Sequence, residues 1–319
     1  MSWQYSDPYE YLRRQGGKMD PLVITAAITG GFQGKEIIPN LPETIEEQAE
    51  EARRCYQAGA SVCHIHVRDP ASGHTLASES VALYRKAFRL IRERCPELII
   101  SISGGGGVNL AEPEQRMRPI EADPDMGDID MGPIAFALTL KKRAAPLSGR
   151  DQDVVLDDVV AVSMGELEEK ARRMTARGIR PECAIFHSGQ WSNFQHLVSK
   201  KLLEPPYVGQ ILLGGQGGDF PTPANLLHHL SLAPAGTVLS VSVIGRHELP
   251  MVTMGIILGL NVVVGMENNI YYSRGKLLES SAQSVERVVR IAKELGRPIA
   301  TPAQARELLG IRAPRSYQD

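Results

Sequence analysis

An alternation of apolar runs and amphipathic segments is the feature that most constrains the fold of this chain. From residue 22 onward, each apolar run of strand length is followed by a longer charged segment with helical periodicity. The runs are apolar almost throughout, which is typical of parallel strands covered on both faces by helices. Strands are predicted at 22–29, 61–67, 98–103, 127–132, 182–188, 208–214, 238–245 and 261–267, and helices at 43–58, 79–94, 112–121, 164–177, 190–202, 222–231, 248–259 and 281–296.

Eight strand–helix units in about 275 residues match the count and size of a (β/α)8 TIM barrel. We therefore predict an α/β protein of this fold, with an open, doubly wound sheet as the alternative, because a sequence does not show closure. The first helix should begin at Thr44, since Glu47 follows three residues later as in a capping box.

The predicted organisation is a single barrel domain over residues 21–319, preceded by an N-terminal extension over residues 1–20. The segment 133–163 has no matching barrel strand and is expected to be an insertion after the fourth strand. Within it, residues 140–153 are polar and charged, which favours an exposed loop.

The charge balance argues against two classes of partner. The chain has 35 Lys and Arg against 37 Asp and Glu, a net charge of -2, so neither nucleic acid nor an anionic membrane is expected to bind. No apolar run approaches the roughly 20 residues of a membrane helix, and the polar N-terminus does not resemble a signal peptide. Four scattered cysteines favour a reducing compartment, hence a cytoplasmic location.

Two histidines give the strongest chemical signal. His64 and His66 are two residues apart on a predicted strand, so their side chains point to the same face at the carboxyl end where barrel active sites form. Glu267 ends the eighth strand and could supply a third ligand if the barrel closes. Such a set with open positions is typical of a catalytic divalent ion, most plausibly zinc. Hydrogen-bonded core histidines and a surface Glu267 are the alternatives.

Other polar residues fall at the same predicted rim. Asp128 and Asp130 share one face of the fourth strand, and in a shared site one of them should have a raised pKa and could act as a base, unless both face solvent. Ser103 precedes four glycines whose N–H groups could bind an oxyanion, Gly105 and Gly106 among them. His187 ends the fifth strand, and Arg246, which could pair with a substrate carboxylate, ends the seventh.

Several motifs together resemble the β-keto acid cleavage enzymes over about residues 21–312. They are TAAITGG (25–31), PNLPET (39–44), AGASVCHIHVRDPASG (58–73), ISISGGGG (100–107), GRHELP (245–250), VGMENNIYYSRG (264–275) and RIAKELGRPIATPAQARELLG (290–310). The resemblance implies a TIM barrel, a zinc-type divalent ion, usually a homotetramer, and condensation of a β-keto acid with acetyl-CoA to acetoacetate and a new CoA thioester.

The resemblance carries over to individual residues. The family's metal ligands match His64, His66 and Glu267, its active-site serine matches Ser103, and the arginine after strand seven matches Arg246.

At other positions the chain departs from the family. Asn268 stands where the family has the Asp implicated as the base, and an amide cannot take a proton. Phe32 replaces a Glu that reads the substrate's amine, which predicts a less cationic substrate. The further departures are Asp128 for a Thr, Asp130 for an Asn, Ala184 for a Glu and Val263 for an Arg.

We therefore predict an acyl-exchange enzyme whose base is Asp130, then Asp128, then His187 in order of preference. The alternatives are a metal-dependent C–C lyase or hydrolase that does not use CoA, and a non-catalytic metal-binding protein.

Overall fold

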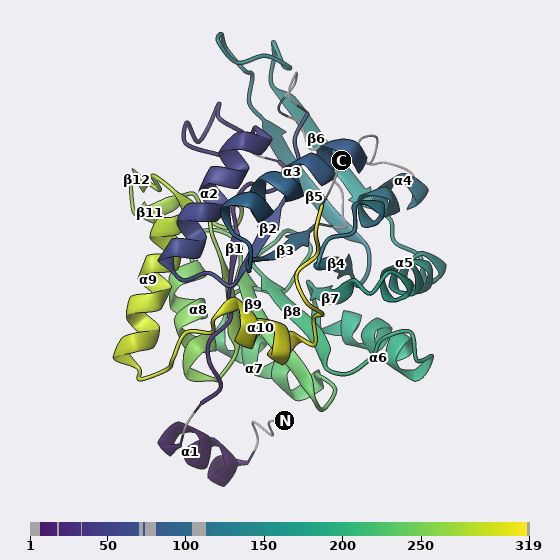
Figure 1. Ribbon diagram of the computed structural model, residues 1–319, viewed down its shortest axis with the longest axis vertical. Coiled ribbons are helices and arrows are strands. Elements are labelled where there is room, and N and C mark those ends of the chain that lie inside the picture. Colours follow the sequence, from purple (N-terminus) through teal and green to yellow (C-terminus); the bar gives the residue numbers. More distant parts are fainter. Residues whose placement is uncertain are drawn as a thin grey trace.

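The computed structural model of the protein describes residues 7–17, 19–32, 34–69, 73, 81–103 and 113–317. Among these, eight parallel strands form a closed barrel in the order β1-β10-β9-β8-β7-β4-β3-β2 (Figure 1). The strands are β1 (Ile24–Ala27), β2 (Val62–Ile65), β3 (Ile99–Ile102), β4 (Met126–Asp130), β7 (Arg180–Ile185), β8 (Tyr207–Leu213), β9 (Thr237–Val243) and β10 (Asn261–Val264). The prediction of a (β/α)8 barrel is confirmed, and each barrel strand overlaps a predicted run.

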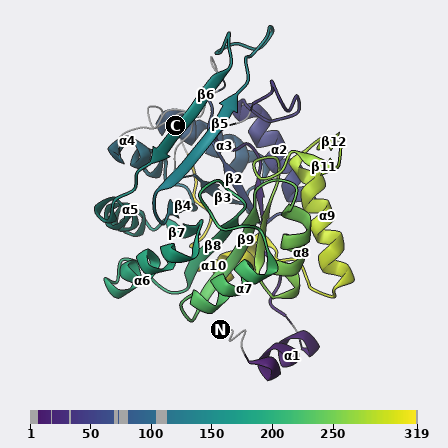
Figure 2. The same ribbon diagram turned by 180° about the vertical axis from the view of Figure 1, so that it is seen from behind.

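The helices pack around the outside of the barrel, as the view from behind also shows (Figure 2). They are α2 (Ile45–Ala58), α3 (Val81–Arg94), α4 (Pro113–Met117) with the 3-10 helix η1 (Arg118–Ala122), α5 (Met164–Ala176), η2 (Ser188–Gln190), α6 (Trp191–Ser199), α7 (Pro223–Leu232), α8 (Glu248–Ile257) and α9 (Ser281–Glu294). The predicted capping box is present, because the Thr44 hydroxyl accepts from Glu47 N and the Glu47 carboxylate accepts from Thr44 N.

Two helices lie outside the eight predicted units. α10 (Pro302–Leu309) crosses the amino-terminal end of the barrel, where its Ala305 and Leu309 pack with Val62, Ile99 and Met126 from the lower lumen. α1 (Pro8–Gly16) lies within the predicted extension, below the barrel in Figure 1, and buries none of its side chains. Over the described residues, no helix is both long and apolar enough to cross a membrane.

The segment 133–163 forms an antiparallel hairpin of β5 (Ile134–Leu140) and β6 (Val154–Val160). The expectation of an exposed loop over residues 140–153 is wrong in part, since Arg143 and Arg150 are buried there by ion pairs with Glu36 and Glu43. A second, smaller hairpin, β11 (Tyr271–Ser273) and β12 (Lys276–Leu277), follows the last barrel strand.

Register decides which side chains enter the barrel. His64 pairs with Ser101, Ser101 with Met126, and Asp128 with Glu182, so these residues share the inner face of their strands. Hydrophobic residues at the intervening positions face the helices and form the main core. The lumen is therefore apolar at its amino-terminal end and polar toward its carboxyl end.

Candidate metal centre and active site

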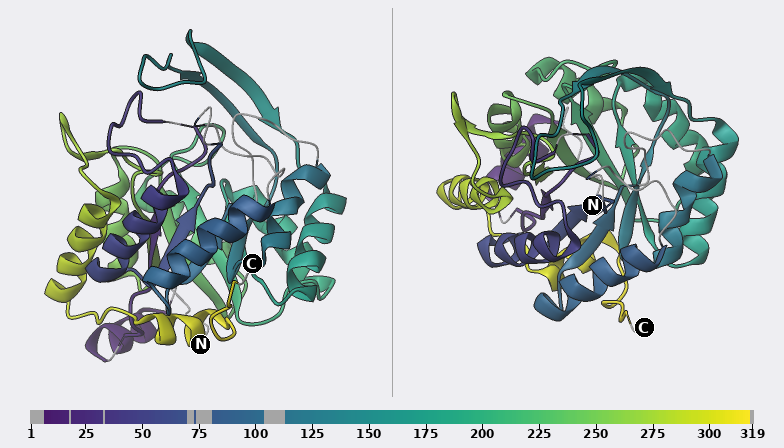
Figure 3. Two further views of the ribbon diagram at one scale, coloured as in Figure 1. Left: turned by 45° about the horizontal axis from the view of Figure 1, so that its top comes forward. Right: turned by 90° about the horizontal axis from the view of Figure 1, so that it is seen from above.

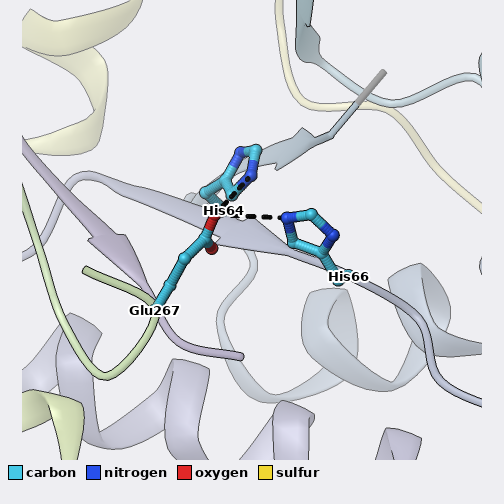
Figure 4. Close-up of side chains that lie close together, drawn as sticks. All are labelled: His64, His66 and Glu267. Atoms are coloured by element: carbon cyan, nitrogen blue, oxygen red, sulfur yellow. Dashed lines mark hydrogen bonds and ion pairs between the residues drawn. The ribbon is translucent and has the colours of Figure 1, made fainter. Parts of the chain in front are cut away.

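The three predicted metal ligands come together at the carboxyl end of the barrel. His64 lies on β2, His66 follows that strand directly, and Glu267 lies in the turn after β10 (Figure 4). Glu267 Oε1 is 3.2 Å from His66 Nε2 and 3.8 Å from His64 Nε2. One potential ligand atom from each residue lies within 4.8 Å of the others.

Two glycines, Gly30 after β1 and Gly265 after β10, allow this convergence. β1 lies between β2 and β10, so Glu267 must reach across it to the histidines. Gly265 has φ +143°, and a Cβ there would lie 2.2 Å from the Ala27 carbonyl oxygen. At Gly30 a Cβ would lie 3.0 Å from Glu267 Cγ. Both glycines are thus required for the close approach that brings Glu267 to the site.

Hydrogen bonds around β2 orient the histidines. Ser101 Oγ lies 3.2 Å from His64 Nδ1, which leaves Nε2 directed toward Glu267. Gln48 Nε2 donates to the His66 carbonyl oxygen at 2.9 Å and fixes the strand end. Ser101 was not predicted from the sequence, although Ser101 and Ser103 have the same spacing on their strand as His64 and His66, which could have indicated it.

The donor set fits a divalent ion. Tetrahedral bonds of about 2.0–2.1 Å place ligand atoms about 3.3 Å apart. Glu267 Oε1 lies 3.2 and 3.8 Å from the two imidazole nitrogens, close to this value. Burial acts to raise the pKa of Glu267, but the charges of His66 and His64 outweigh it and lower the pKa to about 2. Glu267 is therefore ionised at neutral pH, as a metal ligand must be. We conclude that two imidazoles and one carboxylate can hold an ion here and leave coordination positions open.

The inner face of β4 carries two carboxyl groups. Burial, together with the nearby charge of Asp128, raises the pKa of Asp130 to about 7, against the lowering effects of Lys170, His66 and Arg116. A raised pKa for one member of this pair was expected, and the charge of His66 is among the effects that lower the pKa of Asp130.

Glu182, the register partner of Asp128, is a further buried carboxyl that sequence reasoning missed. Burial raises its pKa to about 8, and Ser240 Oγ donates to its Oε1 at 3.4 Å. Its position in the inner row of β7, two residues before Ala184, is the signal that could have identified it.

Asn268 follows the carboxylate ligand and is buried. Its Nδ2 donates to Ser242 Oγ and to the Val263 carbonyl oxygen, both at 3.0 Å, and its main-chain carbonyl oxygen accepts from Gly245 N at 2.8 Å. The side-chain amide thus holds the end of β10 against β9. These contacts use N–H donors, which a carboxylate at the same position could not supply.

The remaining predicted residues lie on loops at the same end. His187 caps η2 after β7, and Ser188 N next to it donates to Asp219 Oδ2 at 2.9 Å. Arg246 follows β9, is exposed, and donates from Nε to His247 Nε2 at 3.2 Å. Ser103 directly follows β3, half-buried.

Phe32 is half-buried on the loop between β1 and α2, and its ring contacts that of Phe136. Gly105 and Gly106, predicted to approach the substrate, lie outside the described residues.

Comparison with known proteins identifies the family. Residues 21–311 match the beta-keto acid cleavage enzyme family. The chain belongs to the β-keto acid cleavage enzyme family. It is 36% identical to a 3-keto-5-aminohexanoate cleavage enzyme of Acetoanaerobium sticklandii over 92% of this chain and 99% of that protein.

More distant members of the family carry other names. A 3,5-dioxohexanoate:acetyl-CoA acetone transferase of Paraburkholderia graminis is 27% identical over 91% of this chain and 96% of its own. A 3-dehydrocarnitine:acetyl-CoA trimethylamine transferase of Rhizobium meliloti is also 27% identical, over 90% and 95%.

Among solved structures, the chain resembles ObcA in its ternary complex with a C4-CoA adduct and oxalate. The TM-score is 0.65 at 18% identity, covering 86% of this chain and 68% of that one. At this identity the likeness concerns the barrel fold alone.

Proposed function

We propose that this family member condenses a β-keto acid with acetyl-CoA, yielding acetoacetate and a new acyl-CoA. The observation that carries the proposal is the convergence of His64, His66 and Glu267 at the barrel mouth, in a chain that belongs to this family. The family relatives named above share acetyl-CoA in two of three names but differ in the acid, which supports a common reaction with a varied substrate.

The reaction needs a group that accepts a proton, the acetyl carbonyl of acetyl-CoA and the keto carbonyl of the acid. A base removes a proton from C2 of the keto acid, and C2 attacks the acetyl carbonyl and expels the CoA thiolate. The thiolate then attacks the original keto carbonyl, the C2–C3 bond breaks, and C2 recovers a proton to give acetoacetate. His64, His66 and Glu267 would hold a divalent ion, which would supply Lewis acidity for the negative charge that develops in the reaction.

We assign the base to Asp130. Its pKa of about 7 lies near the value at which a carboxyl can both accept and return a proton at neutral pH. The adjacent carboxyl of Asp128 and the imidazole of His187 are the next candidates. Asn268 holds β10 instead, since its amide donates to Ser242 and Val263.

The groups that bind the substrate are assigned to residues at the carboxyl end of the barrel. We assign the substrate carboxylate to the exposed guanidinium of Arg246, which can pair with it bidentately. Ser103 is assigned a hydroxyl contact with the reacting keto acid. Phe32 supports a substrate less cationic than an amino-keto acid. Zinc as the ion, a homotetrameric assembly and a cytoplasmic location stay predictions.

The test is turnover by the purified, metal-loaded protein. A panel of 3-keto-5-aminohexanoate, 3,5-dioxohexanoate, 3-dehydrocarnitine and simple 3-keto acids is supplied with and without acetyl-CoA, and acetoacetate is measured. We expect acetoacetate from at least one acid, only with acetyl-CoA. Acetoacetate from none contradicts the proposal, and cleavage without acetyl-CoA indicates a CoA-independent lyase or hydrolase.

A further inference from the structure

The segment that follows the last barrel strand carries an excess of positive charge. It joins β10 to α9 and contains the β11–β12 hairpin. Over residues 270–290 it has four cationic side chains against two carboxylates, hence a net charge of +2 in a chain whose net charge is -2. The cationic residues are Arg274, Lys276, Arg287 and Arg290, and the carboxylates are Glu279 and Glu286.

Three of these cations gather around the side chain of Tyr272. The guanidinium carbon of Arg287 lies 3.7 Å from the centroid of the ring, and Arg287 Nη1 donates to the Tyr272 carbonyl oxygen at 2.8 Å. Lys276 Nζ lies 5.5 Å from the same centroid. Hydrogen bonding and charge from Arg287, and then from Arg290, lower the pKa of Tyr272. Tyr272, Lys276, Arg287 and Arg290 are called the Tyr272 cluster below.

The Tyr272 cluster lacks a carboxylate partner within the part of the chain that the structure describes. None of its three cations forms an ion pair with an Asp or Glu there, whereas Arg53 on α2 pairs with Glu50. Arg287 also acts on the buried carboxyl of Glu248, but burial raises the pKa of Glu248 to about 8, so that this group is mostly protonated at neutral pH. Because the gathered positive charges repel one another, a bound anion would stabilise them.

Hydrogen bonds fix the hairpin to the turn that carries Glu267. Asn269 Oδ1 accepts from Tyr271 N at 3.1 Å, and Asn269 Nδ2 donates to the Tyr271 carbonyl oxygen at 3.0 Å. Tyr272 is five residues beyond Glu267, so at most about 18 Å of chain separates their Cα atoms. Figure 3 shows the hairpin in yellow-green at the outer edge of the carboxyl end of the barrel. In TIM barrels, loops after the seventh and eighth strands frequently bind phosphate.

We propose that the Tyr272 cluster binds the phosphate groups of acetyl-CoA. This molecule carries a pyrophosphate and a 3′-phosphate at one end and its thioester at the other, separated by the long pantetheine arm. Guanidinium groups and a phenol hydroxyl donate to phosphate oxygens, and a lysine ammonium adds a positive charge. The arm then extends from the edge of the barrel toward the metal triad. The inference rests on the proposed function and names the residues that hold its co-substrate.

The experiment measures binding, which does not depend on turnover. Acetyl-CoA and acetyl-pantetheine, which lacks the nucleotide, are each titrated into the protein without a keto acid, and Kd is determined by calorimetry. The double variant Lys276→Gln/Arg290→Gln removes two exposed charges and keeps Arg287, which supports Tyr272. We expect its Kd for acetyl-CoA to rise about tenfold, and its Kd for acetyl-pantetheine to stay unchanged. Added salt should weaken the binding of acetyl-CoA alone.

The matched control removes the same two charges elsewhere. Lys293→Gln/Arg312→Gln alters an exposed lysine in the last turn of α9 and an exposed arginine beside Gly178, just before β7, and should leave both Kd values unchanged. Melting temperatures show that both variants are folded.

Two results would overturn the inference. One is a folded Lys276→Gln/Arg290→Gln variant that binds acetyl-CoA as tightly as the unsubstituted protein does. The other is a variant that loses acetyl-pantetheine to the same extent, because the effect would then not concern the phosphates. Selective loss of acetyl-CoA binding, in a protein that makes acetoacetate from no β-keto acid, would support the phosphate site and contradict the proposed function.

Discussion

The metal triad (His64, His66 and Glu267) and the β5–β6 hairpin over residues 134–160, called the arch below, both depend on contacts between distant parts of the chain. Different interactions position the two regions. His66 and Glu267 are 201 residues apart and are positioned by strand register and by glycines that allow the backbone to approach closely. Arg143 and Glu43 are 100 residues apart and are positioned by their own buried charges. Substitutions in the arch should therefore leave the geometry of the triad unchanged. Removing one of the buried charges should undock the arch.

Removing a ligand should have the largest effect on activity. His66→Ala leaves one histidine and one carboxylate, too few to retain a divalent ion, so metal content and acetoacetate formation should fall below detection. Metal analysis by plasma mass spectrometry and the acetoacetate assay check this. His196→Ala, which alters a histidine paired with Glu168 on the helical surface, should keep both. A His66→Ala protein with a full complement of metal would contradict the assignment.

Removing the proposed base should lower kcat by about 10²–10⁴-fold while metal content is kept. The rate of the unsubstituted protein should rise with pH through about 7, because Asp130 must be deprotonated to act, and Asp130→Asn should abolish that rise. Asp157→Asn on the exposed side of β6 is the control. A rise that survives in Asp130→Asn assigns the base to another group.

The same raised pKa of Asp130 affects stability in the opposite direction, since the rate should rise with pH whereas the stability should fall. A carboxyl whose pKa is higher in the folded state binds more protons there than in the unfolded state. Its contribution to the free energy of unfolding therefore falls as pH rises from about 4 to about 7. Chemical denaturation across this range should show Asp130→Asn losing less stability than the unsubstituted protein.

The arch should be the more fragile region in folding terms. Arg143→Met leaves Glu43 buried without its guanidinium partner and Glu36 with Arg150 alone, and should destabilise the docked hairpin by about 3–5 kcal/mol. Hydrogen exchange of residues 134–160 measures this, and metal content should not change. Lys141→Met removes an exposed pair with Asp153 and should cost at most about 1 kcal/mol.

Acid should weaken the same contact. Although burial acts to raise the pKa of Glu43, its hydrogen bonds with Arg143 and Lys35 N lower it overall. The stabilisation is therefore present above the unfolded pKa and is lost as pH falls through the lower folded value. Exchange in the hairpin that shows no acid dependence would argue against a role for this cluster in docking.

Ser101→Ala should have the smallest effect. Loss of the hydroxyl beside His64 Nδ1 frees the ring to rotate, and metal affinity should fall about 10–100-fold. Competition with a chelator measures it. Ser240→Ala, a lumen serine beside Glu182 rather than the triad, is the control and should leave affinity unchanged.

The contrast between the two regions also explains what could be predicted from the sequence. The eight apolar runs predicted the barrel strands, and the spacing of His64 and His66 predicted a shared face, because both patterns are local. Glu267 could be added since closure makes β1 the neighbour of β2 and β10. Strand parity and barrel closure together thus predicted that these three possible metal ligands lie close to one another.

The arch could not be predicted in this way. Nothing near Arg143 or Arg150 in the sequence indicates Glu36 or Glu43 as partners, so a charged segment was expected to be exposed. β5 and β6 are not part of the alternating strand–helix pattern that predicted the barrel, since they form a separate two-stranded sheet. The helices α1 and α10 are also outside the eight strand–helix units. The contact between Phe32 and Phe136 depends on where the hairpin docks, which only the folded chain shows.

Glu267 follows the last barrel strand, whereas His64 and His66 belong to the second, so the three ligands are synthesised at different times. A chain growing from its amino terminus presents both histidines early, but the third ligand emerges some two hundred residues later. It reaches them only once the last strand has closed against the first. An ion at this site would therefore stabilise the closed barrel, because it would bind the complete barrel far more tightly than any shorter chain.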